Sequence, residues 1–347
     1  MTGTEQQDIL SMTLPELQAA VQELGEPKFR AKQIFNWLHQ KRVTDFSEMT
    51  TLSLPFRERL ASDFCINRLK IAKRLASSVD DTVKYLYELP DGNYVETVCM
   101  QYHHGTSLCI STQVGCRMGC RFCASAIAGF VRNLTPAEML LQIYETERAQ
   151  NCKISSLVLM GIGEPLDNFD NVLRFLQLLS DPNGYGMSLR HVTVSTCGVV
   201  PKILELAEQR LGLTLSVSLH CPNDAGRSAI MPINRSYPID VLLDACQTYF
   251  EKTGRRVTFE YAVMDQVNSA EQDAAALAER LKGLHAHVNL IPINPVKERN
   301  FHTLKKTVLQ FQKTLERYGI PATIRRTLGS DIEAACGQLR RDAIQQT

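Results

Sequence analysis

The chain has 347 residues, of which 44% are hydrophobic and 22% are charged, with a formal net charge of +1. This composition is that of an ordinary globular protein with one large and one small domain, and it excludes a disordered or fibrous one. The first residues, MTGTEQQDIL, lack the features of a signal peptide, and no stretch reaches the roughly 20 apolar residues that span a bilayer. We therefore expect a cytoplasmic protein with no membrane partner.

The cysteines are numerous but do not suggest a disulfide framework. There are 11 of them, an odd number, scattered from Cys65 to Cys336. A reducing compartment would keep them as thiols or metal ligands, so cysteine or metal chemistry is expected. Six of them are expected to be structural: Cys65, Cys99, Cys152, Cys197, Cys221 and Cys246.

The N-terminal segment, from residue 8 to about residue 75, is predicted to be helical. Thr13 and Glu16 form a capping box before the first helix, which ends at Gly25. A second helix follows Pro27, and its basic residues form either a solvated face or an RNA-facing one. They are Lys28, Arg30, Lys32, Lys41 and Arg42. We assign residues 1–80 to a small helical domain, a candidate for RNA binding.

A change to a period of two follows at about residue 83. VKYLYEL, the turn PDGN and YVETVCMQY predict a β-hairpin extension over residues 81–106. Beyond it, short β-branched runs alternate with helical stretches, which indicates parallel βαβ units. Six such strands predict an α/β fold, a partial (β/α)6 TIM-like barrel over residues 107–340.

Candidate functional motifs follow the predicted strand ends, where barrels of this kind carry their chemistry. These motifs are the cysteine-rich loop, GIGEP, STCG, SLHCPND and IPINP. After the first strand, Thr135 and Glu138 form a capping box with Pro136 at the first helical position, which predicts a helix.

The cysteine-rich loop spaces Cys116, Cys120 and Cys123 as Cys-x3-Cys-x2-Cys. Three such thiolates can converge on a zinc ion or on an iron–sulfur cluster. A structural zinc site would want a fourth ligand, which Cys109 or His220 could supply, and would indicate a non-catalytic RNA-interaction protein. A [4Fe-4S] cluster held by three cysteines has one iron open to a small molecule. The spacing alone leaves both open.

Several motifs carry a family resemblance. CRMGCRFC, with an aromatic residue before the last cysteine, resembles the signature of radical S-adenosylmethionine (SAM) enzymes. Within that superfamily, the chain resembles the RlmN/Cfr family of RNA adenine methyltransferases over roughly residues 13 to 340. The motifs are CISTQVGCRMGCRFCASAIAGFVRNLTPAE, MGIGEPLDN, STCGVVP, SLHCPNDAGRSAIMPIN, IPINP and DIEAACGQL. The resemblance implies a [4Fe-4S] cluster on Cys116, Cys120 and Cys123, and two SAM molecules per turnover.

The resemblance also implies a set of SAM contacts at the strand ends. Any one of them alone would more often be a capping or turn residue, and their ordered recurrence is what favours a binding role. The set is Gly163, Glu164, Ser195, Ser218, Leu219, His220 and Asn294.

Three further residues receive catalytic roles from the resemblance. Cys336 is the methyl carrier, and Cys109 resolves it through a transient disulfide. By composition alone, Cys336 would be a small buried apolar residue. Glu96 stands at the place of the proton acceptor, on a strand face with Val98 and Met100, where it would be partly desolvated. By pattern alone, it would be a solvated edge-strand glutamate.

The implied reaction explains the need for a carrier. Adenine C2 is electron-poor and bears an unactivated C–H bond, so direct polar attack on the SAM methyl group is not available to it. Covalent catalysis splits this hard step in two: the Cys336 thiolate first takes a methyl group, and a radical route then joins the carrier carbon to adenine. Proton removal and attack by Cys109 release the product.

The choice of substrate follows from finer features. GEPLDN and IPINP resemble the adenine-C2 branch rather than the C8-specific Cfr-like branch, which remains the alternative. The C2 branch implies an adenosine in the peptidyl-transferase region of 23S rRNA, use of the tRNA adenosine 3′ of the anticodon as well, and an electron donor such as flavodoxin. An unstacked base in a loop is expected. Because the net charge is small, phosphates would need local basic groups. These are Lys28, Arg30, Lys32, Arg117, Arg121, Arg132, Arg325 and Arg326.

Overall fold

The computed structural model describes residues 6–127, 129–292 and 303–332. Its centre is one ten-stranded sheet with the strand order β14-β13-β12-β11-β10-β9-β6-β5-β4-β3. The predicted Asn294 and Cys336 lie outside the described residues.

The seven strands from β6 to β14 in this order are all parallel. Their bounds are β6 Gly105–Cys109, β9 Ile154–Leu159, β10 Val192–Thr196, β11 Thr214–Ser218, β12 Val257–Val263, β13 Ala286–Pro292 and β14 Ala322–Ile324. This confirms the predicted radical-SAM type of partial barrel, with short β14 as a seventh strand.

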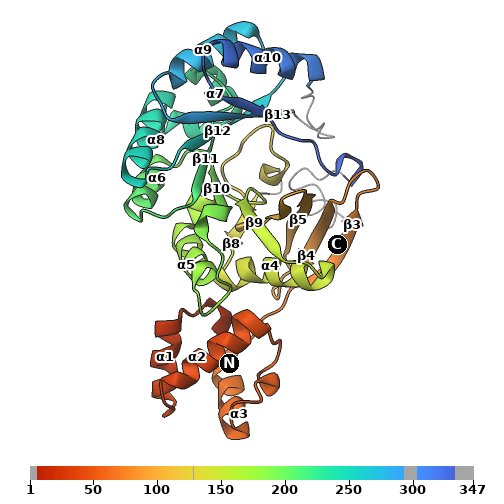
Figure 1. Ribbon diagram of the computed structural model, residues 1–347, viewed down its shortest axis with the longest axis vertical. Coiled ribbons are helices and arrows are strands. Elements are labelled where there is room, and N and C mark those ends of the chain that lie inside the picture. The colour runs from red at the N-terminus through yellow and green to blue at the C-terminus, as the bar shows by residue number, and fades with distance from the viewer. Residues whose placement is uncertain (1–5, 128, 293–302, 333–347) are drawn as a thin grey trace.

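Helices cover the outer face of the parallel strands (Figure 1). They are α4 Pro136–Gln150, α5 Phe169–Ser180, α6 Val200–Glu208, α7 Asp224–Ile230, α8 Ile239–Thr253, α9 Glu271–Leu281 and α10 Lys305–Arg317. The predicted capping box at Thr135 and Glu138 is present at the start of α4. On β10, Val192 and Val194 are fully buried, and alternation turns Ser195 to the other face.

The same sheet continues into four antiparallel strands. They are β3 Lys70–Ala76, β4 Val83–Glu88, β5 Tyr94–Tyr102 and β6. The predicted hairpin is β4 and β5, and β6 joins it to the barrel by pairing antiparallel with β5 and parallel with β9. β3 is mostly exposed and has a bulge between Ile71 and Lys73.

The N-terminal helices form a separate layer below the barrel in Figure 1. They are α1 Leu14–Glu23, α2 Phe29–Asn36 and α3 Leu54–Asp63, joined by the two-stranded sheet of β1 Gln7–Asp8 and β2 Phe64–Cys65. The capping box of Thr13 and Glu16 is present, as predicted. The prediction that helix extends to about residue 75 is wrong, because Lys70–Ala76 is strand β3. The three-domain division itself stays a prediction.

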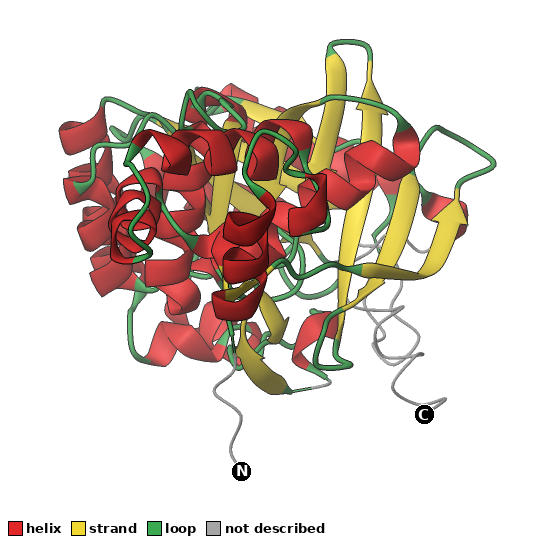
Figure 2. Cartoon of the chain, turned by 90° about the horizontal axis from the view of Figure 1, so that it is seen from below, coloured by secondary structure: helices red, strands yellow, loops and turns green. Residues whose placement is uncertain are grey.

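A small two-stranded sheet flanks the cysteine-rich loop. β7 Gln113–Gly115 and β8 Phe130–Asn133 pair antiparallel on either side of the cysteine-rich loop. Figure 2 shows the strands from below, with helices packed along one side. None of the helices in the described ranges is long and apolar enough to cross a membrane.

Buried polar side chains link the N-terminal layer to α4. His39 is 1% exposed, and its Nδ1 lies 2.9 Å from the hydroxyl of Tyr144. Arg42 pairs with the buried Glu147 at 2.5 Å. Burial lowers the pKa of His39 to about 4, because the charged ring would lose its hydration. The neutral ring is therefore part of the interface.

We expect acid to weaken this interface through His39. Its pKa is lower in the folded chain than in the unfolded chain, so its contribution to stability is intact above about pH 6.5 and falls as the pH drops towards 4. The maximal slope is about 1.4 kcal/mol per pH unit. The variant His39→Asn keeps a polar atom for Tyr144 but does not titrate, so its unfolding free energy should fall less steeply in urea titrations at successive pH values. The exposed His191→Asn should behave as the wild type, and equal slopes in all three proteins would contradict this assignment.

Candidate active site

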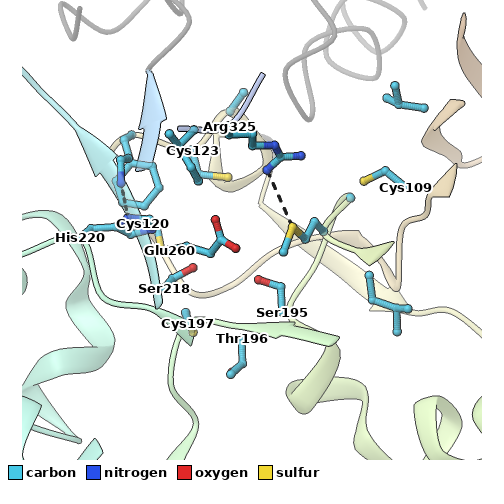
Figure 3. A pocket seen from close by; sticks show the side chains of 18 of the residues that line it. Cys109, Cys120, Cys123, Ser195, Thr196, Cys197, Ser218, His220, Glu260 and Arg325 are labelled. Carbon is cyan, nitrogen blue, oxygen red and sulfur yellow. Dashed lines mark hydrogen bonds between the residues drawn. The ribbon is translucent and has the colours of Figure 1, made fainter. Parts of the chain in front are cut away.

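A cavity of about 340 Å³ lies at the C-terminal ends of the parallel strands. Figure 3 shows side chains that line it, which come from β6, the cysteine-rich loop, the ends of β10 and β11, and the middle of β12. The predicted residues that line it are Cys109, Cys116, Cys120, Cys123, Gly163, Glu164, Ser195, Ser218 and His220. The structure thus brings together motifs that are more than one hundred residues apart in sequence.

The cysteine-rich loop is held by the β7–β8 pair. Gly115 has a φ of +79°, and a Cβ atom there would come within 1.7 Å of the carbonyl oxygen of Gly129, so only glycine fits. Further along, the Arg121 backbone N–H donates to the carbonyl of Ile230 at 2.9 Å. These contacts fix both sides of the loop that carries Cys116, Cys120 and Cys123.

The three thiols share an electrostatic environment that suits a metal centre. Burial raises the pKa of Cys116 to about 12, and the neighbouring Cys123 adds to this rise, although the Met118 backbone N–H opposes it. Burial and the other two cysteines also raise the pKa of Cys120. Bound iron would compensate such crowded thiolates, so the donor set fits an iron–sulfur cluster. In the described ranges, no three His, Cys, Asp or Glu side chains are grouped closely enough to hold a single metal ion.

The GIGEP segment presents a buried carboxylate beside this loop. Gly163 has a φ of +111°, and a Cβ there would lie 2.8 Å from the Gln113 backbone nitrogen. The Glu164 carboxylate accepts the backbone N–H of Cys197 at 2.7 Å and that of Leu166 at 3.0 Å. Burial raises the pKa of Glu164. A cationic amino group in the cavity would find an acceptor that is already oriented.

The two serines predicted to contact SAM reach the cavity, whereas the side chain of Leu219 does not. Ser195 and Ser218 line the cavity from β10 and β11. The side chain of Leu219 is fully buried in the main hydrophobic core, and its carbonyl accepts from Arg227 at 3.2 Å. Arg227 therefore holds the backbone of Leu219 in place, while the Leu219 side chain packs in the core.

His220 is fixed in one tautomer. It has a left-handed φ of 59°, and its Nδ1 accepts the Ala262 backbone N–H at 2.9 Å, which leaves the proton on Nε2. Burial, together with Arg227, lowers its pKa to about 3, so the ring is neutral. Its edge packs against Phe122, with ring centroids 4.6 Å apart. His220 thus connects the cysteine-rich loop to the end of β12.

Two buried charged residues of the site were not predicted. Glu260 on β12 lines the cavity, accepts from Ser216 at 2.6 Å and Asn289 at 2.8 Å, and has a pKa raised by burial. Arg227 is fully buried and donates to the carbonyl oxygens of Cys197, Ser218 and Leu219. In the sequence, Glu260 is marked only as a charge within the apolar run FEYAV, and Arg227 only as a charge within the short segment DAGRSAI.

Cys109 and Glu96 lie on the sheet that forms another wall. Cys109 ends β6, is 4% exposed and lines the cavity. Glu96 is 3% exposed and pairs with Lys84, so the alternative of a solvated edge-strand glutamate is wrong. No disulfide joins two cysteines of the described ranges, so the predicted disulfide is not supported, and the proposed partner Cys336 lies outside them.

Four of the eight basic residues predicted for phosphates lie close to the cavity or the cysteine-rich loop and divide into two groups. Arg117 pairs with Asp167 at 2.9 Å, and Arg132 pairs with Asp91 at 2.6 Å and Glu138 at 2.8 Å, so both have carboxylate partners within the chain. Arg325 and Arg326 line the cavity instead. These two remain placed for an anionic ligand.

Comparisons with known proteins agree with this architecture. Residues 7–66 match a family model described as the ribosomal RNA large subunit methyltransferase N-terminal domain, and residues 110–278 match the radical SAM superfamily. A radical SAM methyltransferase from Sphaerobacter thermophilus has a similar crystal structure, with a TM-score of 0.91, 40% identity, and coverage of 96% of this chain and 98% of that one. The fold and the cysteine-lined cavity are thus those of a radical-SAM enzyme.

Curated relatives give the narrower assignment. A protein named probable dual-specificity RNA methyltransferase RlmN from Lachnoclostridium phytofermentans is 51% identical, over 99% of this chain and 97% of the relative. Its namesake from Clostridium novyi is 48% identical, over 97% and 99%. The chain belongs to the RlmN family of SAM-dependent RNA methyltransferases.

The close contact between Gly163 and Gln113 predicts that this position does not tolerate a side chain. Gly163→Ala should weaken SAM binding by at least about tenfold, because the new methyl group must displace Gln113 or the GIGEP backbone. Equilibrium dialysis with labelled SAM on the iron-loaded protein measures this. Gly92→Ala is the matched control, since Gly92 also has a positive φ but nothing within 4 Å of the place that a methyl group would take. Equal affinities in the two variants would contradict the role of this contact.

Proposed function

We propose that this enzyme methylates C2 of an adenosine in the peptidyl-transferase region of 23S rRNA, and also the tRNA adenosine 3′ of the anticodon. The observation that carries the proposal is the single cavity that joins the cysteine-rich loop, the strand-end polar groups and Cys109. The relatives are named dual-specificity RNA methyltransferases, which supports two RNA substrates. GEPLDN and IPINP favour C2 over C8.

The cofactor part of the proposal assigns the cluster to three cysteines. Cys116, Cys120 and Cys123 would hold a [4Fe-4S] cluster, and Glu164 with Ser195, Ser218 and His220 would bind SAM. When bound, these groups supply one electron, from a donor such as flavodoxin, and the methyl carbon, with two SAM molecules used per turnover. Glu164 suits an ammonium group, because its carboxylate is buried and held by two backbone N–H groups.

The remaining chemistry belongs to side chains of the chain. The Cys336 thiolate would take the methyl group by nucleophilic displacement. Glu96 would accept the proton that leaves adenine C2, and the Cys109 thiolate would attack the sulfur of Cys336 to free the base and form a disulfide. Cys109 is suited to this step because it lies in the cavity wall and not in the remote core.

The RNA base must leave its stack to reach the cavity. Apolar side chains such as Met118 and Phe122 line part of the cavity. Arg325 and Arg326 line another part of it, directly after β14. An unstacked adenine with a neighbouring phosphate has the matching chemistry. We therefore expect loop RNA to be the substrate, with affinity that falls as salt is added.

The position of methylation can be tested directly. We expect the iron-loaded enzyme to convert adenosine to 2-methyladenosine in a 23S rRNA fragment and in a tRNA anticodon stem-loop, as read by mass spectrometry of the digested nucleosides. Methylation at C8 would replace the C2 proposal with the C8 alternative. Product on rRNA alone would remove the tRNA part of the proposal.

The cluster ligands can be tested by metal content. Wild-type protein purified without oxygen should hold about four irons per chain. Cys116→Ala, Cys120→Ala and Cys123→Ala should each lose more than about half of this iron, whereas Cys246→Ala, which removes a buried thiol from α8, should not. One zinc without iron in the wild type would favour the structural-metal alternative.

A further inference from the structure

A buried ion pair lies in the sheet wall next to the cavity. Lys84 Nζ is 2.8 Å from Glu96 Oε2, and the two side chains are 0% and 3% exposed. Lys84 is on β4 and Glu96 on β5, and both strands have a neighbour on each side in the sheet. A lysine with no exposed surface is rare in proteins unless it is paired.

The register places this pair on the cavity face of the sheet. Val98 lies directly opposite Lys84 on β4 and directly opposite Cys109 on β6. Paired residues of adjacent strands share a face, and Glu96 shares that face because it is two residues before Val98. Val98 and Cys109 both line the cavity. Lys84 and Glu96 therefore belong to the sheet face that carries the proposed resolving cysteine.

Burying this ion pair costs stability, which favours a functional reason for its presence. Removing two charges from water is unfavourable, and an apolar pair of similar volume is often as stable or more stable. On the described part of this sheet face, the neighbouring side chains Leu86, Val98 and Met100 are apolar and buried.

We propose that Lys84 is a positioning residue for Glu96: its ammonium group pairs with the carboxylate and holds it on the sheet face that lines the cavity, placed to accept a proton from the substrate. This inference rests on the proposed function, in which Glu96 is the proton acceptor. A carboxylate buried without a counter-charge favours its neutral form, which cannot accept a proton. The lysine thus supplies the counter-charge that a buried carboxylate base needs.

Other titratable groups on this sheet face are few and more distant from the pair along the strands. The described ones are Lys70 and Lys73 on β3, Glu88 on β4, Tyr94 and Tyr102 on β5 and Cys109 on β6. Lys70 and Glu88 are 3.9 Å apart at the exposed end of the sheet, and Arg325 faces the cavity from beyond β14. Lys84 is the cation that contacts Glu96 in this set.

The test compares methylation rates against pH in iron-loaded enzyme with the rRNA fragment. Lys84→Met keeps the length of the side chain but removes its charge, so we expect about a tenfold lower rate near neutral pH. The acid limb of the profile should move upward, because the buried carboxylate loses its counter-charge in this variant. Lys84→Arg should restore the limb, and Glu96→Gln should be inactive at every pH.

The matched control is Lys70→Met, which removes the exposed lysine of the neighbouring pair with Glu88 and should leave the profile unchanged. Lys84→Gln is a second neutral variant in case Lys84→Met does not fold, and it should show the same upward shift. SAM binding by each variant shows that the cavity is intact.

A spectroscopic measurement tests the charge without any turnover. Infrared difference spectra at neutral pH should show a protonated carboxylic acid band in Lys84→Met that is absent from the wild type and from the double variant K84M/E96Q. A wild-type pH profile in both neutral variants, with no such band, would overturn the inference. Full activity of Glu96→Gln would instead overturn the role of Glu96 in the proposed function, and the infrared result would still report on the charge.

Discussion

Backbone groups that are left unpaired where parallel strands end impose the main constraint on this molecule. The strands stop inside the protein, so their last carbonyl and N–H groups need partners away from water. Arg227 donates to three of these carbonyls, those of Cys197, Ser218 and Leu219, and Glu164 accepts the N–H of Cys197. These bonds tie together the segments that end or follow β9, β10 and β11. The resulting fixed edge is what holds Ser195, Ser218 and His220 around one cavity.

A second consequence concerns how two kinds of sheet cooperate. The parallel strands supply the side of the cavity that is proposed to bind the cofactor, and β5 and β6 supply a wall with Val98 and Cys109. The Lys84–Glu96 pair lies on the same face of β4 and β5. β6 belongs to both kinds of sheet, because it pairs antiparallel with β5 and parallel with β9. A single continuous sheet therefore sets the distance between the cysteine-rich loop and the residues proposed to act on the base.

The fold and most of the site could be predicted because local patterns carry them. Alternating runs identified β4, β5 and the barrel strands, and ordered motifs picked out Ser195, Ser218 and the three cysteines of the cysteine-rich loop, which all line the cavity. Strand β3 was missed because KIAKRLA is polar and almost wholly exposed, so no buried face marks it. Arg227, Glu260 and Lys84 were missed for a different reason: their partners lie on other strands or loops, and only the register of the sheet shows that these charges are buried together.

The exposed strand β3 has a consequence for the protein in a crowded cell. As the last strand of the sheet, it presents backbone groups that could recruit a strand from another molecule and start aggregation. Its sequence opposes this. Lys70, Lys73 and Arg74 project from it, and the bulge after Ile71 interrupts the regular spacing that an incoming strand would need. The same polar character that conceals β3 in the sequence thus opposes growth of the ten-stranded sheet at this edge.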